Sequence, residues 1–140
     1  MKHPPESERL RKTRKDHSTE IAEDYVELIA EIIEESGSCR VTAIARRMGV
    51  SHVTASRTVG RLASAGLVET RPHHPVELTS KGKRLATTVR KRHQIVYDFL
   101  RLLGVSETTA DSDAEGIEHH CSVETIQAMS RALDENRRIR

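Results

Sequence analysis

The chain has 140 residues and a formal net charge of +2, a length that fits one compact domain or two small lobes. It has no apolar run of about 18 residues and no apolar signal region, so it predicts neither a membrane span nor secretion. Its two cysteines, Cys39 and Cys121, do not make a disulfide framework. We therefore expect a cytoplasmic protein whose modest core gains stability from pairing with a second copy.

The basic residues concentrate in the middle of the chain. Residues 40–92 contain twelve Lys and Arg residues against two acids, whereas residues 18–39 contain seven acids and neither Lys nor Arg. Residues 93–140 carry a net charge of −4. Charge runs often do no more than solvate a helix, but a bias this large favours one segment that meets a polyanion and another that holds cations.

Residues 1–17 are predicted to be a basic, disordered arm, because they carry two prolines and no apolar period. From Ser18 onward, apolar residues recur at helical spacing as far as Ile33. Ser18 or Thr19 is the expected N-cap of this helix, and Gly37 its end.

Residues 42–65 indicate a helix-turn-helix. Thr42 is expected to cap a short first helix, Gly49 makes the turn, and Ser51 caps the second helix. Val53 is assigned to the inner face of this pair. Two strand-like pieces follow around a turn rich in Pro and His, which is typical of the wing of a winged helix.

Ser80 is expected to cap a long helix that ends at Gly104, a shorter helix runs from about 108 to 120, and Ser122 caps the last helix. The predicted fold is mainly α. Residues 18–79 form an N-terminal winged helix-turn-helix with a small β wing, and residues 80–140 form a linker helix and a C-terminal helical domain.

A helix that enters the major groove of DNA needs short polar and basic side chains, and flanking Lys and Arg bind phosphates. The second helix and the wing tip offer such side chains, namely Ser51, His52, Thr54, Ser56, Arg57, Arg61, Arg71 and His73. Thr58 is placed on the same stripe. One arginine alone is usually a solvated charge, but fold pattern and charge together favour double-stranded DNA over a protein-binding winged helix.

The stretch EGIEHH, residues 115–120, crowds titratable groups together. Glu115, Glu118 and His119 are three and four residues apart, so they share one face of a helix. Such a face is either an ordinary polar surface or part of a metal site.

Three more residues of the same chemistry lie elsewhere. Asp24 and Glu27 have the i, i+3 spacing on the first helix, and His93 lies in the long helix. Each one alone has an ordinary explanation as a surface acid or a boundary histidine. Together with EGIEHH they supply four carboxylates and two imidazoles, a hard oxygen and nitrogen donor set that suits Mn(II) or Fe(II).

Two rival functions use the same residues. A di-metal hydrolase would use the carboxylates and histidines, but the chain offers no second, cleft-forming domain and the helix-turn-helix would be unexplained. A winged-helix regulator of another ligand is the second rival, although only three aromatic residues are present to build a ligand cage. The chain also lacks GxSxG and any Gly-rich phosphate loop.

Four stretches resemble the Mn-responsive branch of the diphtheria toxin repressor family of metalloregulators. They are EDYVELI at 23–29, LTSKGKRLA at 78–86, RHQIVYDFLRLLGV at 92–105 and AEGIEHH at 114–120. The resemblance covers nearly everything outside the basic arm. One departure is the wing RPHHP, since relatives commonly carry a Gly at the tip.

The resemblance implies a non-enzymatic, homodimeric transcriptional regulator joined through its C-terminal helices. Two Mn(II) ions per protomer would order the dimer for binding to operator DNA and repress manganese uptake genes, with Fe(II) as the alternative metal. The residues that match the family's metal ligands are Asp24, Glu27, His93, Glu115, Glu118 and His119. Iron-responsive relatives carry Cys or Met where Glu118 stands, so Glu118 favours manganese.

Overall fold

A computed structural model describes residues 3–139, apart from the side chain of Asp16, and these residues divide into two compact units. One unit is Ile21–Thr88, and the other combines the described residues before Ile21 with those after Thr88. The elements, in chain order, are α1 (Glu6–Ser36), α2 (Val41–Met48), α3 (His52–Ser64), β1 (Val68–Glu69), β2 (Glu77–Leu78), α4 (Ser80–Leu102), α5 (Glu107–His120) and α6 (Val123–Ile139). No helix within residues 3–139 is both long and apolar enough to cross a membrane.

Helix α1 begins at Glu6, so the prediction of a disordered arm over residues 1–17 is wrong from that residue onward. Residues Glu6–Ser36 contain no Pro or Gly, and their abundant Glu, Lys and Arg are good helix formers. Since the helix runs straight through Ser18 and Thr19, neither residue is its N-cap. Gly37 ends the helix as predicted, with a φ of 82° in the left-handed region.

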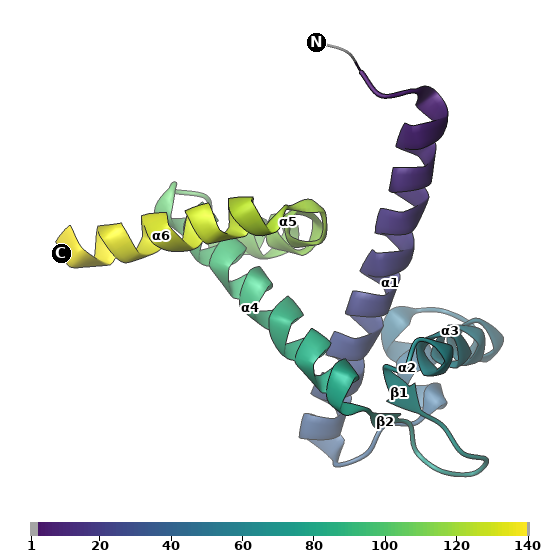
Figure 1. The fold of residues 1–140 in the computed structure, drawn as a ribbon. Helices are drawn as coiled ribbons and strands as arrows, with labels where there is room; N and C mark the ends of the chain where they lie inside the picture. The colour runs from purple at the N-terminus through teal and green to yellow at the C-terminus, as the bar shows by residue number, and fades with distance from the viewer. Residues whose placement is uncertain (1–2, 140) are drawn as a thin grey trace. The chain divides into compact units, whose positions relative to one another are not determined.

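The helix-turn-helix of the Ile21–Thr88 unit is confirmed. The C-cap of α2 is Gly49, with a φ of 68°, and Ser51 caps α3 by accepting a hydrogen bond from the Thr54 amide. Arg40 occupies the N-cap position of α2 without a side-chain bond, so Thr42 is not the cap. Figure 1 shows α2, α3 and the hairpin gathered around the second half of α1.

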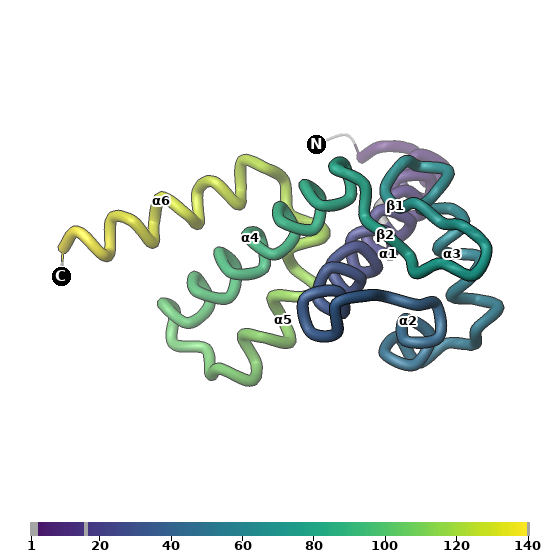
Figure 2. The backbone as a smooth tube through the Cα atoms, turned by 90° about the horizontal axis from the view of Figure 1, so that it is seen from below, coloured from purple at the N-terminus to yellow at the C-terminus, as the bar shows by residue number. Residues whose placement is uncertain are grey.

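The wing is a short antiparallel hairpin in which Val68 pairs with Leu78 and Glu69 with Glu77. Both strands are two residues long, shorter than the sequence pattern predicts, because the Pro and His residues between them do not continue the ladder. The tube in Figure 2 shows the loop between β1 and β2 extending beyond the hairpin. The wing therefore presents its tip, rather than a broad sheet, to solvent.

An apolar core holds the Ile21–Thr88 unit together. Ile29 of α1 and Ile44 of α2 are fully buried in it, and Val59 of α3 is 2% exposed. The hairpin closes the core against α4, where a Cβ on Gly82 would collide with the carbonyl oxygen of Leu67. Gly82 amide also donates a hydrogen bond of 3.1 Å to the Thr79 hydroxyl, so Thr79 rather than Ser80 caps α4.

The other unit has a smaller apolar core. Val96 of α4, Ala114 of α5 and Ile126 of α6 are buried together, with partly buried neighbours such as Met129 around them. Helix α6 begins as predicted, since the Thr125 amide donates to the Ser122 hydroxyl at 3.2 Å. This arrangement places the C-terminal turns of α5 beside the second half of α4.

Candidate metal centre and nucleic-acid interface

All eight side chains predicted to contact DNA are exposed to solvent. Those on α3 or at its N-cap are Ser51, His52, Thr54, Ser56, Arg57 and Arg61, and those in the loop between the strands are Arg71 and His73. Because they lie in one unit, the recognition helix and the wing are both free to meet the same duplex.

Two residues of α3, Val53 and Thr58, lie on the faces opposite to those that the sequence pattern predicts. Thr58 is 8% exposed and its hydroxyl donates to the Thr54 carbonyl oxygen at 3.1 Å, so it does not face a ligand. Thr58 shares the inner face with Ala55 and Leu62, at i, i+3 and i+7. Val53 lies on the opposite side, where it is 58% exposed and could contact a thymine methyl group.

The wing tip adopts a backbone conformation that glycine usually supplies. His73 has a φ of +64°, and outside glycine this region is tolerated best by Asn, Asp and His. His73 can therefore hold this turn conformation without a glycine. The acids Glu69 and Glu77 pair at the loop end of the ladder, so a phosphate backbone would meet the loop beyond them.

Three of the predicted metal ligands lie together in the unit that contains the residues after Thr88. One ligand atom each from His93, Glu115 and Glu118 falls within 4.8 Å of the others. His93 is contributed by α4, and its Nδ1 lies 3.3 Å from Oε1 of Glu115. The i, i+3 spacing of Glu115 and Glu118 on α5 aims both carboxylates at that ring.

The inner part of this cluster is shielded from water. The Glu118 side chain is 0% exposed and the His119 side chain 1%, and Nε2 of His119 lies 3.4 Å from Oε1 of Glu118. A carboxylate withdrawn from water is stable only when it is paired or binds a cation. Its burial beside two imidazoles is the feature that distinguishes this cluster from an ordinary polar surface.

Asp24 and Glu27 lie on successive turns of α1 in the Ile21–Thr88 unit, and both side chains are partly buried. Their i, i+3 spacing puts the two carboxylates on one face of the helix, as predicted. The other four predicted ligands all belong to the second unit.

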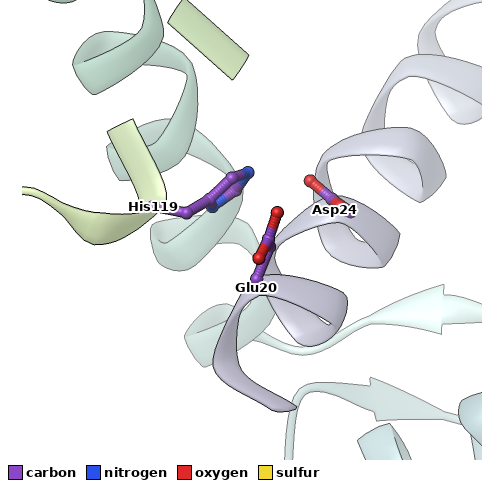
Figure 3. Close-up of side chains that lie close together, drawn as sticks. All are labelled: Glu20, Asp24 and His119. Carbon is purple, nitrogen blue, oxygen red and sulfur yellow. The ribbon is translucent and has the colours of Figure 1, made fainter. Parts of the chain in front are cut away.

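The sequence analysis overlooked two acids that accompany the predicted ligands. Glu20 has a ligand atom within 4.8 Å of one from His119 (Figure 3). Its Oε2 also lies 3.3 Å from Nε2 of His120. Asp111 lies 3.3 Å from His93. Glu20 precedes Asp24 by four residues and Asp111 precedes Glu115 by four, so the helical spacing that identified the predicted ligands also identifies these two.

The donor atoms of these clusters fit a hard divalent cation. They are carboxylate oxygens and imidazole nitrogens, which suit Mn(II) or Fe(II), and no thiolate is among them. Nδ1 of His93 is buried, makes no hydrogen bond and faces the Glu115 carboxylate, so it can serve as a metal ligand when it is unprotonated.

Neither cysteine adds a soft ligand to these clusters. Cys39 is fully buried in the apolar core, and this burial raises the pKa of its thiol to about 11. Cys121 is the C-cap residue of α5 and packs against the small core. Ion pairs of Arg47 with Glu35 and Glu31 join α2 to α1. A hydrogen bond and charge attraction from Glu35, with Glu31 beside it, raise the pKa of the Arg47 guanidinium.

Two sequence models of one family match the chain, one in each half. The model described as the iron dependent repressor, N-terminal DNA binding domain matches residues 17–76. The model described as the iron dependent repressor, metal binding and dimerisation domain matches residues 79–138. The first match contains the helix-turn-helix, and the second contains the cluster of His93, Glu115 and Glu118.

Similar proteins of known identity support the same assignment. The transcriptional regulator MntR of Escherichia coli O157:H7 is 48% identical over 121 residues, which are 86% of this chain and 78% of the relative. The regulator MntR of Bacillus subtilis strain 168 is 37% identical over 109 residues, 78% of this chain and 77% of the relative. A solved manganese-dependent transcriptional repressor in complex with manganese has 32% identity and a TM-score of 0.72, over 81% of this chain and 52% of that one. This chain therefore matches about half the length of that solved repressor.

Proposed function

Because the chain belongs to the iron dependent repressor family, we propose that it is a manganese-responsive transcriptional repressor that binds operator DNA as a homodimer and controls manganese uptake genes. The observation that carries the proposal is the cluster of His93, Glu115 and Glu118, in which the Glu118 carboxylate is fully buried. A repressor of this kind has no catalytic role and works on DNA in the cytoplasm.

The proposed metal ligands are the six residues predicted from the sequence: Asp24, Glu27, His93, Glu115, Glu118 and His119. Six protein ligands, some of them carboxylates able to bridge, are enough for two ions per protomer. Bound cations would place positive charge beside these carboxylates. Glu20, beside His119, is proposed as a further oxygen ligand.

Manganese is preferred over softer metals because every proposed ligand is a carboxylate or an imidazole. Similarity to the solved manganese-dependent transcriptional repressor and to the manganese regulator SloR supports the same choice. Fe(II) accepts the same donor types, so an iron response is the second candidate and must be measured alongside the first.

DNA binding is proposed for the exposed face of α3 and for the wing. Arg57 and Arg61 are four residues apart, so they lie on one side of the helix and can contact bases or phosphates. Val53 adds an apolar contact. Arg71 and His73 at the wing tip would contact the backbone or the minor groove beside it.

A homodimer is supported by apolar side chains that are exposed to solvent in the unit containing the residues after Thr88. Leu103 is 65% exposed, Val123 72% and Ile139 86%. Pairing would cover such residues and present two recognition helices to two half-sites of the operator. If metal favours the DNA-binding form of the dimer, metal occupancy and DNA affinity are linked, and each raises the other by the same factor.

The test is DNA binding by fluorescence anisotropy, with the promoter of a manganese transporter gene as the duplex. Mn(II), anaerobic Fe(II), Zn(II) and a chelator are compared at one salt concentration, because salt alone changes affinity strongly. We expect Mn(II) to tighten binding far more than Zn(II), and His93→Ala to abolish the difference. An affinity that ignores every metal would contradict the proposal, whereas a stronger response to Fe(II) would support the iron sensor.

A further inference from the structure

The imidazole of His93 is held at both edges by acids of α5. Its Nδ1 lies 3.3 Å from Oε1 of Glu115, and its Nε2 lies 3.3 Å from Oδ1 of Asp111. We propose that Asp111 is a positioning residue that orients His93 and selects the tautomer with a free Nδ1 for the metal. This inference rests on the proposed metal site, although Asp111 is not one of its ligands.

The helical register of α5 makes the arrangement possible. Asp111, Glu115 and Glu118 are at i, i+4 and i+7, so they form one stripe along the helix. The ring of His93 spans one turn of that stripe, with Glu115 at its Nδ1 edge and Asp111 at its Nε2 edge.

The two edges of the ring lie in different surroundings. Nδ1 is buried, whereas the side chain of Asp111 is 72% exposed. His93 and Asp111 line an open cavity of about 440 Å³ together with Gln94, Tyr97, Glu107 and Thr108. The Nε2 edge is therefore where a proton can be held without occupying the metal-facing nitrogen.

A neutral imidazole carries one N–H and one lone pair, and a metal needs the lone pair. If Nε2 carries the proton, it donates to Asp111 and Nδ1 is left to face Glu115 and Glu118. A hydrogen bond from the second ring nitrogen to a carboxylate is a recurrent way to fix the orientation of a metal-binding histidine. Asp111 would thus prepare His93 before any metal arrives.

The competing explanation is an ordinary surface ion pair with no effect on metal binding, since exposed pairs often contribute nothing measurable. The two explanations differ in what removal of the carboxylate does. A positioning residue changes the tautomer of His93 and the affinity for the metal, whereas a surface pair changes neither.

The variants for the test are Asp111→Ala and Asp111→Asn in the full-length chain. Asp113→Ala is the matched control, because it removes the same charge from the same exposed helix about 200° around its axis. His93→Ala serves as the reference for loss of the ligand itself. Mn(II) affinity is measured from the EPR signal of free Mn(II), without DNA.

We expect Asp111→Ala to weaken Mn(II) binding about 10-fold, the lower end of the range for partners of metal ligands, because Asp111 is exposed. Asp111→Asn should lose less, since its amide oxygen still accepts a hydrogen bond. Asp113→Ala should match the wild type.

A second readout reports the tautomer directly. Long-range ¹H–¹⁵N correlation spectra of the metal-free protein at about pH 8, where an ordinary histidine is neutral, assign the proton to Nε2 or Nδ1. We expect the Nε2–H form of His93 in the wild type and in Asp113→Ala. Asp111→Ala should show a mixture of the two tautomers.

The outcomes separate this inference from the proposed function. If His93→Ala loses Mn(II) binding while Asp111→Ala binds as tightly as the wild type and keeps its tautomer, Asp111 is only a surface partner and the inference is overturned. Equal losses in Asp111→Ala and Asp113→Ala would also overturn it, since charge alone would explain them. If the wild type itself does not bind Mn(II), the proposed function fails and the inference with it.

Discussion

The two units of the chain are stabilised in different ways. Among the described residues, the Ile21–Thr88 unit has a core cluster of fourteen buried residues, and the cluster of the other unit has three. Conversely, the second unit contains the fully buried Glu118 and nearly all of the large apolar side chains that remain exposed, the exception being Val53.

This difference indicates that the two units have different functions. The first unit packs its recognition helix against a core of buried apolar side chains. The second unit buries a carboxylate and exposes apolar side chains, which fits the proposed binding of a cation and of a second copy. Four of the six proposed ligands belong to the second unit, so changes there are expected to alter the metal response most, and the following changes test this contrast in order of decreasing effect.

The largest effect is expected for Ile29→Ala, in the centre of the first core. Ile29 is fully buried, and truncation of such a side chain typically costs about 2–5 kcal/mol of unfolding free energy. Leu10→Ala on the same helix is the control, because Leu10 is 50% exposed and should change stability by less than about 0.5 kcal/mol. Urea unfolding measures both, and equal effects would contradict the contrast between the units.

Glu118→Gln is expected to remove the stabilisation that Mn(II) gives to the wild type. At a Mn(II) concentration 100 times the dissociation constant, that stabilisation is about 2.7 kcal/mol. Glu124→Gln, an exposed acid in the first turn of α6, should keep it. Thermal unfolding with and without Mn(II) makes the measurement, and a full Mn(II) effect in Glu118→Gln would exclude that residue from the site.

Gly82→Ala tests the join between the wing and α4. The added methyl would fall against the Leu67 carbonyl, which cannot move aside as a flexible side chain can, so we expect a loss of roughly 1–3 kcal/mol. Gly60→Ala is the opposite case, since nothing lies within 4 Å of its Cβ position inside α3. It should stabilise the protein by roughly 0.4–1 kcal/mol. Chemical unfolding of the metal-free protein distinguishes them.

The smallest effect is expected for Glu20→Gln. Glu20 is partly exposed beside His119 and His120, and interactions of such charges are worth about 1 kcal/mol or less. Mn(II) affinity, followed by EPR, should therefore fall by no more than about fivefold, with Glu8→Gln unchanged. A loss as large as that of His93→Ala would instead make Glu20 an essential ligand.

The sequence predicted the elements that carry local signals. Ser51 and Ser122 cap helices where expected, and Gly37 and Gly49 end them, because these signals depend only on the nearest turn of the chain. The start of α1 was missed because an exposed helix without an apolar stripe has no period to detect.

Prediction of the site also succeeded where the signal is local in the sequence. Glu115, Glu118 and His119 were found from their spacing, but spacing alone does not tell which face of a short helix is buried. For that reason the sequence pattern placed Val53 on the inner face of α3 and Thr58 on the exposed stripe. The structure has the reverse, with Val53 58% exposed and Thr58 8% exposed. The burial of Glu118 depends on α4, which is distant in sequence, and only the folded chain reveals it.

The raised pKa of Cys39 has a practical consequence. With a pKa of about 11, roughly one thiol in ten thousand is a thiolate at neutral pH, and the side chain is fully buried as well. Cys121 is then the single cysteine open to a maleimide fluorophore, at the end of the helix that carries Glu115 and Glu118. The natural sequence thus already contains an attachment point for an optical reporter of metal occupancy.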